Sequence, residues 1–143
     1  MEKISFDSGI RSYRLNDGGI LRFNPGDPNL YGRFLEAGEK IEKVETELRK
    51  NAKQEPSGKD AIRMLREADS KIKEILSWVF GEHNDFHKLL EGVNLMAVAD
   101  NGERVVANLF AALQPVLTEG AKRCAREQTE AAVNRARQRR GEK

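Results

Sequence analysis

The chain has 143 residues, of which 38% are hydrophobic and 34% charged, and its formal net charge is +2. This composition excludes a disordered chain, and the small net charge gives no overall case for attraction to nucleic acid or to a membrane surface. The length predicts one domain, residues 1–143, that buries about two thirds of its unfolded surface.

Residues 1–24 are expected to form a β-hairpin region. In residues 2–7, Ile4 and Phe6 alternate with polar residues, and this period of two predicts a half-buried strand. Residues 7–9, Asp-Ser-Gly, predict a bend after that strand. The chain is therefore expected to begin with a strand that turns into the domain.

The hairpin itself is predicted over residues 11–23. Residues 11–15 alternate, with Tyr13 and Leu15 on one face, and residues 20–23 form the return strand. The sequence Asn-Asp-Gly-Gly lies between them and is typical of the primed turns that need φ above zero. A hairpin alone is marginal in water, so we expect it to lie on the helices that follow.

The hydrophobic period changes from strand to helix at the junction formed by residues 21–31. Asn24-Pro25-Gly26 predicts a turn, because the proline biases the residue before it away from helix. Asp27 can accept a hydrogen bond from a free amide of a first helical turn, and Pro28 suits the first helical position. The junction therefore predicts a strand, a turn and a capped helix.

Two long amphipathic helices are predicted next. The first covers residues 28 to about 52, up to the breaker cluster at residues 54–58, and the second covers about 59–80. Gly81 is expected to end the second helix in a left-handed conformation. Because the loop between the helices is short, the simplest packing is an antiparallel pair. Their apolar stripes comprise Leu30, Phe34, Leu35, Ile41, Val44 and Leu48, and then Ile62, Leu65, Ala68, Ile72, Ile75, Leu76 and Val79.

A short third helix is predicted over residues 82–90, with Asp85 as its N-terminal cap and Gly92 just beyond its end. An apolar connection, residues 93–98, follows, and Asp100-Asn101-Gly102 restarts the chain into a final helix. The stripe of this final helix comprises Val105, Val106, Leu109, Phe110, Leu113 and Leu117.

Pro115 lies inside the final helix, where it removes a backbone donor and crowds the preceding turn, so we expect the helix to be interrupted by a kink. Further along, the stripe shrinks to alanines and Cys124, which bury little area. Residues 119–143 carry eight Lys or Arg against four Glu, and they are expected to project as a basic helical arm that frays from Arg135. With a helical core over residues 28–118, the predicted fold class is mainly α (α+β): an N-terminal β-hairpin packed on a small helical bundle, with a long C-terminal helix.

No catalytic, cofactor-binding or metal-binding residue can be nominated from the sequence. His83 and His87 stand four apart on one face of the predicted third helix, but the string His-Asn-Asp-Phe-His lacks the glutamate of a zincin motif and no third histidine exists. Cys124 is the single cysteine and has no positioned histidine, so we interpret it as a small apolar helix residue. No glycine-rich phosphate-binding loop is present. We therefore expect a protein that is not an enzyme and that needs no cofactor.

The compartment follows from what the sequence lacks. One cysteine cannot form an intramolecular disulfide, so a reducing compartment is the default. No run approaches the ~18 apolar residues of a membrane span, and the first residues lack the pattern of a signal peptide. A cytoplasmic protein without membrane contact is expected.

The basic arm leaves a second interpretation open. Arg135, Arg137, Arg139 and Arg140 could neutralise phosphates, although no aromatic residue is interleaved for stacking and several glutamates dilute the charge. The simpler interpretation is a solvated helix end with cations near its negative dipole pole. A small DNA-associated regulator is therefore the alternative function, and nucleic acid is not the favoured partner.

Four short segments together resemble the small tail assembly chaperones of long-tailed (siphovirus-type) phages and prophages of Gram-positive bacteria. They follow the family's order and span most of the chain. Each is weak by itself, so the order carries the resemblance. The segments are Ile4-Ser5-Phe6-Asp7-Ser8-Gly9, Leu21-Arg22-Phe23-Asn24-Pro25-Gly26-Asp27-Pro28, Val79-Phe80-Gly81, and Asp100-Asn101-Gly102-Glu103 with Asn108-Leu109-Phe110.

The resemblance implies a non-enzymatic assembly factor in the cytoplasm of the host bacterium. Proteins of this family bind the long helical tape measure protein, keep it soluble and assist assembly of the tail tube. The implied partners are the tape measure protein, the tail tube protein and further copies of the chain in a homo-oligomer. The family has no catalytic residue to transfer, and the resemblance assigns no partner-binding residue.

Overall fold

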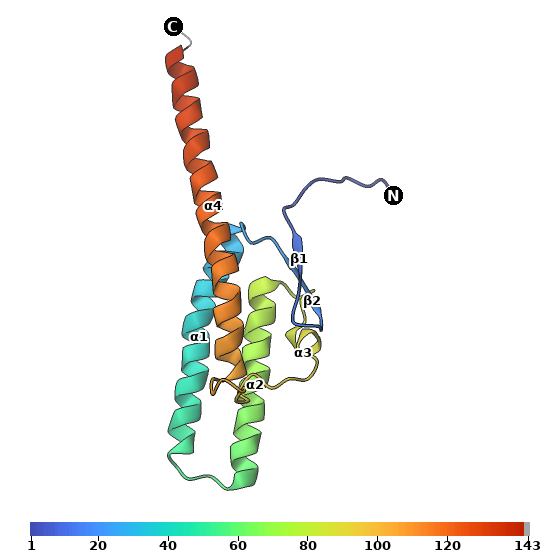
Figure 1. Cartoon of the computed structure of the whole chain (residues 1–143), viewed down its shortest axis with the longest axis vertical. Coiled ribbons are helices and arrows are strands. Elements are labelled where there is room, and N and C mark those ends of the chain that lie inside the picture. Colours follow the sequence, from blue (N-terminus) through green and yellow to red (C-terminus); the bar gives the residue numbers. More distant parts are fainter. Residues whose placement is uncertain (142–143) are drawn as a thin grey trace.

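The computed structural model describes residues 1–141, and 62% of the chain is helical. A small antiparallel hairpin precedes a helical body and a long C-terminal helix (Figure 1), so the predicted fold class is confirmed. The elements are β1 (Arg11–Arg14), β2 (Ile20–Phe23), α1 (Pro28–Ala52), α2 (Gly58–Phe80), α3 (Phe86–Leu89) and α4 (Val105–Gly141).

Local capping explains where α1 and α2 begin. The Asp27 carboxylate accepts a hydrogen bond from the amide of Asn29 at 2.9 Å, and Pro28 is the first residue of α1, as predicted. Helix α2 begins one residue earlier than predicted, because the hydroxyl of Ser57 accepts from the amide of Asp60 at 3.2 Å. The breaker cluster thus contains the cap of the next helix. The two helices form the expected antiparallel pair (Figure 1).

Gly81 ends α2 with a positive φ, as predicted, but it does not adopt the left-handed helical conformation. Its φ of 105° is positive, whereas its ψ of 146° is extended. The chain turns back at once, since the backbone amide of Asn84 donates to the Gly81 carbonyl at 2.9 Å. A Cβ at Gly81 would also lie 2.8 Å from the ring of His83, so glycine is required at this turn.

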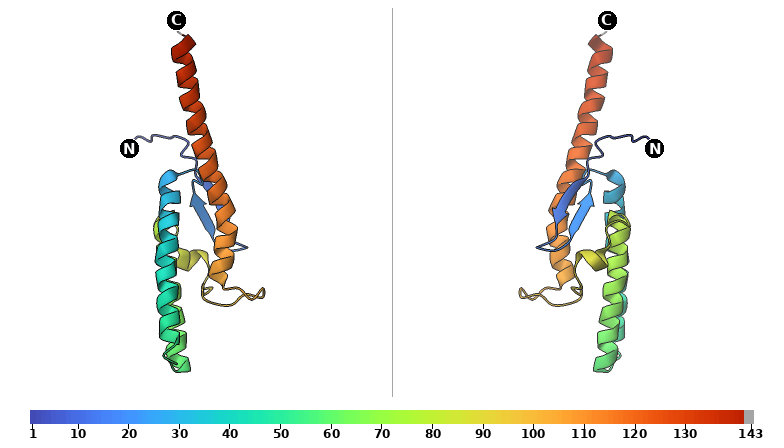
Figure 2. Two further views of the ribbon diagram at one scale, coloured as in Figure 1. Left: turned by 90° about the vertical axis from the view of Figure 1, so that its left-hand side faces the viewer. Right: turned by 90° about the vertical axis from the view of Figure 1, so that its right-hand side faces the viewer.

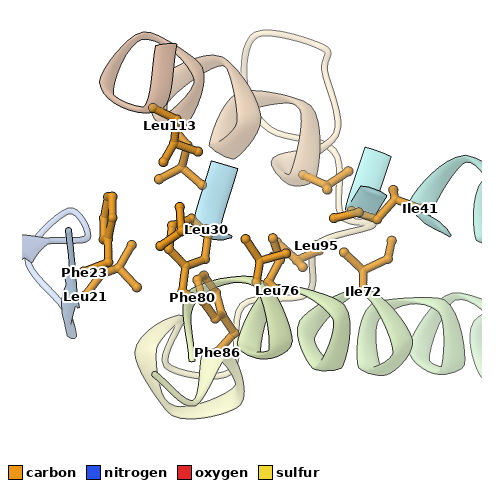
Figure 3. Packing of buried hydrophobic residues seen from close by; sticks show 14 of the residues in the cluster. Leu21, Phe23, Leu30, Ile41, Ile72, Leu76, Phe80, Phe86, Leu95 and Leu113 are labelled. Atoms are coloured by element: carbon orange, nitrogen blue, oxygen red, sulfur yellow. The ribbon is translucent and has the colours of Figure 1, made fainter. Parts of the chain in front are cut away.

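The core lies between two layers. Figure 2 shows α1 and α2 forming one layer, with the hairpin and α4 on one side of it. Leu21 and Phe23 of β2 point from the hairpin toward Phe80 of α2 (Figure 3). The ring of Phe80 lies 4.9 Å from that of Phe23 and 5.5 Å from that of Phe86. Aromatic packing therefore joins the hairpin, α2 and α3 in one core.

The buried side-chain amide of Asn84 fastens the hairpin to the helical body. Its Oδ1 accepts from the backbone amide of Arg22 at 3.0 Å, and its Nδ2 donates to the carbonyl of Arg22 at 2.8 Å. The same Nδ2 lies 2.8 Å from the carbonyl of Phe80, at the end of α2. One side chain thus pairs with the outer edge of β2 and with the last turn of a helix.

Helix α4 docks on the strand-to-helix junction. Gly120 of α4 lies against Pro25, and a Cβ at Gly120 would overlap the Pro25 carbonyl. Nearer the start of α4, the ring of Phe110 lies 5.7 Å from that of Phe34 of α1. The junction therefore positions the first half of α4, and the second half extends beyond the body (Figure 1).

Helix α4 differs from two expectations. The helix is continuous across Pro115, so the proline does not break it, and Leu113 and Leu117 on either side are buried in the core; a kink of the helix axis at Pro115 stays a prediction. Tertiary packing of these leucines compensates for the lost backbone donor. The predicted fraying from Arg135 is not seen either, since helix extends to Gly141, and the rest of the predicted frayed end lies outside the described residues.

The predicted strand over residues 2–7 is also wrong. Residues 1–10 form no strand, and Ile4 and Phe6 are 89% and 81% exposed. A strand without a neighbour leaves its backbone hydrogen-bonding groups unpaired, and the sheet in the described chain has only β1 and β2. The predicted bend is present at Gly9, whose φ is +75°.

Helix α3 is shorter than predicted. It covers only Phe86–Leu89, with Asp85 as the expected cap, because the preceding residues form the turn that presents Asn84 to β2.

The connection after α3 is held by Asp69 of α2, whose carboxylate accepts from the Leu95 amide at 2.7 Å and from the buried ammonium of Lys73 at 3.0 Å.

Replacement Asn84→Ala should lower the free energy of unfolding by about 2–3 kcal/mol, because it leaves buried backbone groups at the end of α2 and at β2 without their partner. Urea unfolding monitored by circular dichroism measures this loss. Asn134→Ala, at an exposed position of α4, is the matched control and should change the value by less than about 0.5 kcal/mol. Equal effects of the two changes would contradict the role of Asn84.

Two glycine-to-alanine changes should act in opposite directions. Gly120→Ala should destabilise the protein by about 1–3 kcal/mol, because the added methyl group overlaps the Pro25 carbonyl. Gly38→Ala lies inside α1, where a Cβ would meet no atom within 4 Å, and should stabilise the protein by about 0.5–1 kcal/mol. Thermal unfolding of both variants checks the signs, and a neutral Gly120→Ala would contradict the docking of α4 at the junction.

Candidate interaction surface

A groove runs between α1 and α2 and is lined by residues of these two helices alone. We call it the α1–α2 groove. Its end nearest Gly81 contains Lys40, Lys43, Val44, Lys71, Ile75 and Trp78, with Glu74 beside them. Val44 and Lys71 also line its continuation toward the loop that joins the helices, which includes Leu48 and Met64.

The groove exists because the apolar stripe of α2 is wider than the surface that covers it. Ile72, Leu76 and Val79 are buried in the core, whereas Ile75 is only half-buried and Trp78 is 38% exposed. In the described chain, α1 covers one side of Ile75 and Trp78, and their other side forms the apolar floor of the groove.

Positive charge borders this floor. The ammonium of Lys40 lies 3.7 Å from the centre of the Trp78 ring, a cation–π contact that holds the lysine stem over the indole. Lys43 and Lys71 add two more cations beside Glu74 at the end of the groove nearest Gly81, whereas Glu47 and Glu67 line its continuation. The groove therefore suits an amphipathic helix whose apolar stripe is flanked by acidic residues.

The structure does not bring His83 and His87 onto one helix face. Residues 82–85 are a turn and α3 begins at Phe86, so the four-residue spacing loses its helical meaning. His83 lies beside Asn84, with Nε2 3.2 Å from the amide Nδ2, and His87 is exposed on α3. Among residues 1–141, no group of three or more His, Cys, Asp or Glu side chains could hold a metal ion.

Cys124 and the basic residues lie on the second half of α4. Cys124 is half-buried where α4 leaves the body, just beyond the contact of Gly120 with Pro25. Arg135, Arg137, Arg139 and Arg140 are exposed near the end of the projecting arm. The arm therefore presents its cations away from the helical body (Figure 1).

Sequence reasoning misses two important positions. Asn84 lies between the two histidines of the candidate metal pair, and only its buried contacts with β2 distinguish it from a loop asparagine. Trp78 lies near the end of α2, outside the apolar stripe predicted for that helix. A signal is present, since Trp78 and Ile75 are three residues apart and thus share a helix face.

A scan against protein-family models, a search of curated proteins and a search of solved structures each returned no match for this chain. In the part of the chain that the structure describes, none of the helices combines the length and the apolar character needed to cross a membrane.

Proposed function

We propose that this protein is a non-enzymatic tail assembly chaperone that binds the tape measure protein in the cytoplasm of a phage-infected or lysogenic bacterium. The observation that carries the proposal is the α1–α2 groove, an apolar floor at Ile75 and Trp78 bordered by Lys40, Lys43 and Lys71. The ordered resemblance of the chain to phage tail assembly chaperones supplies the identity of the partner.

The chemistry of the groove supports binding of a helix. A tape measure protein is a very long helical chain, and its apolar stripe must be covered until the tail tube encloses it. A groove between two helices can bury such a stripe while its lysines pair with acidic residues on the partner. Several copies of the chain along one tape measure protein would cover successive segments and leave ends free to recruit the tail tube protein.

Co-expression with the tape measure protein tests the proposal. The wild-type chain should bring the tape measure protein into the soluble fraction and co-elute with it. Trp78→Glu should weaken binding at least about tenfold, because a buried tryptophan commonly contributes about 2 kcal/mol or more at an interface. Quantitative immunoblotting of the soluble fraction and size exclusion with light scattering measure the effect.

Ile62→Glu provides the matched control for this experiment. Ile62 is 58% exposed on α2. It lies nine residues before Lys71, a spacing that places it on the opposite side of the helix from the groove. The substitution adds the same charge to the same helix and should leave binding intact. A tape measure protein that stays insoluble with the wild-type chain, or equal losses from the two variants, would contradict the proposal.

The projecting arm favours one alternative, a small DNA-associated regulator. Arg135, Arg137, Arg139 and Arg140 lie on a helix that extends clear of the body, where a duplex could approach. Charge alone would give binding that is insensitive to sequence.

Titration of duplex DNA over a salt series tests this alternative. If it is right, the logarithm of the affinity should fall with the logarithm of the salt concentration by about 0.9 per phosphate contacted, and replacing the four arginines with alanine should remove the binding. Lys50→Ala, at an exposed position near the end of α1, should not change it. Absence of binding at low salt would exclude the alternative.

A further inference from the structure

The outer edge of β1 is an open sheet edge. In the hairpin, Leu15 donates to Gly19 at 2.9 Å, so with the register Tyr13↔Leu21 the odd-numbered residues of β1 form the hydrogen-bonded pairs. The backbone groups of Ser12 and Arg14 therefore point away from β2. The sheet in the described chain has only two strands, so no third strand lies against these groups.

The other edge of the hairpin is already closed. The outward backbone groups of Arg22 in β2 are paired with the side chain of Asn84, and the Gly19 amide donates to the Leu89 carbonyl at 3.3 Å. The edge of β2 is therefore occupied at Gly19 and Arg22, and β1 offers the edge along which an added strand can pair.

A groove borders this open edge and has an apolar floor. It lies between the end of β1 and the start of α4, and it is lined by Arg14, Leu15, Val105, Asn108, Leu109 and Ala112 among others. Tyr13, at the edge, is half-buried, and its ring stacks on Phe23 at 4.9 Å. Tyr13 is thus the last of the packed aromatic rings that link the hairpin to α2 and α3, and one side of its ring is uncovered at the open edge.

The same chain carries a segment with the properties of the missing strand. Residues 2–7 alternate apolar and polar side chains, and Ile4 and Phe6 are almost fully exposed. The segment leaves the body in an extended form (Figure 1), because Asn24 holds its base. The side-chain amide of Asn24 donates to the Ser8 carbonyl at 3.1 Å, and a Cβ at Gly9 would lie 2.7 Å from that amide.

We propose that residues 2–7 of one copy of this chain add as a third, antiparallel strand to the outer edge of β1 in a second copy. The segment does not fold back on its own β1, because the contact with Asn24 directs it away from the body. The proposal does not depend on the tape measure protein and stands whether or not that protein fills the α1–α2 groove.

The register follows from matching side chains. Pairing Phe6 with Tyr13 places Ile4 opposite Leu15, so both apolar side chains lie on the core face of the sheet, and Ile4 lies next to the groove that Leu15 lines. On the other face, the same register places Ser5 opposite Arg14 and Asp7 diagonal to it, where the opposite charges attract. Apolar and charged positions therefore agree on one register.

Light scattering tests the proposal by measuring the association of full-length variants. The wild-type chain should have a mass above the 16.1 kDa of one copy. Phe6→Asp should raise the dissociation constant at least about tenfold, since it removes the main apolar contact. Ser12→Pro should do the same by removing an outward donor, while the hairpin keeps its own hydrogen bonds. Ser5→Asp is the matched control on the same segment, and because position 5 lies opposite Arg14 it should associate at least as tightly as the wild type.

Mixing the two defective variants gives the decisive result. Phe6→Asp keeps an intact edge and Ser12→Pro keeps an intact segment, so a mixture should form a 1:1 complex although each variant alone is a monomer. Unchanged circular dichroism of each variant shows that it is folded. The proposal is overturned if the wild-type chain is a monomer, if Phe6→Asp associates as the wild type does, or if the mixture stays monomeric.

Discussion

The hydrogen bonds of Asn84 are the constraint on which the hairpin, the end of α2 and the position of α3 all depend. Its buried side-chain amide pairs with both backbone groups of Arg22, as a neighbouring strand would, and it also donates to the Phe80 carbonyl in the last turn of α2. Because the amide occupies the edge of β2, the rings of Phe23, Phe80 and Phe86 are held within contact of one another. The same constraint leaves the edge of β1 as the only open side of the sheet in the described chain.

Local signals in the sequence are enough to locate most helices. The limits of α1 and α2 depend on capping at Asp27 and Ser57, and such interactions involve residues only two or three positions apart. A strand cannot be located from local signals alone, because the segment that pairs with it can lie anywhere in the chain. The alternation in residues 2–7 therefore indicates a strand, but it does not show that the described chain lacks a strand to pair with it. The unbroken course of α4 past Pro115 is hidden for a similar reason, since it depends on buried leucines that dock on other elements.

The candidate site could be predicted less well than the fold. The spacing of His83 and His87 suggests a shared helix face, but the turn before α3 removes the helix that would have aligned them. The α1–α2 groove depends on which parts of two apolar stripes stay uncovered after packing, and this is a property of the tertiary structure. In the sequence, Trp78 and Ile75 resemble the core residues Ile72 and Val79. Only the packed structure shows that Ile72 and Val79 are buried and that Trp78 and Ile75 line the groove.

The measurement that tests the central claim most directly is site-specific photocrosslinking in cells that also produce the tape measure protein. Benzoylphenylalanine in place of Trp78 reports contacts in the α1–α2 groove, and the same group in place of Ile62 reports contacts on the opposite side of α2. A chaperone that holds a tape measure helix in the groove predicts cross-links to that protein from position 78 and few from position 62. Equal yields from the two positions, or none from position 78, would contradict the account.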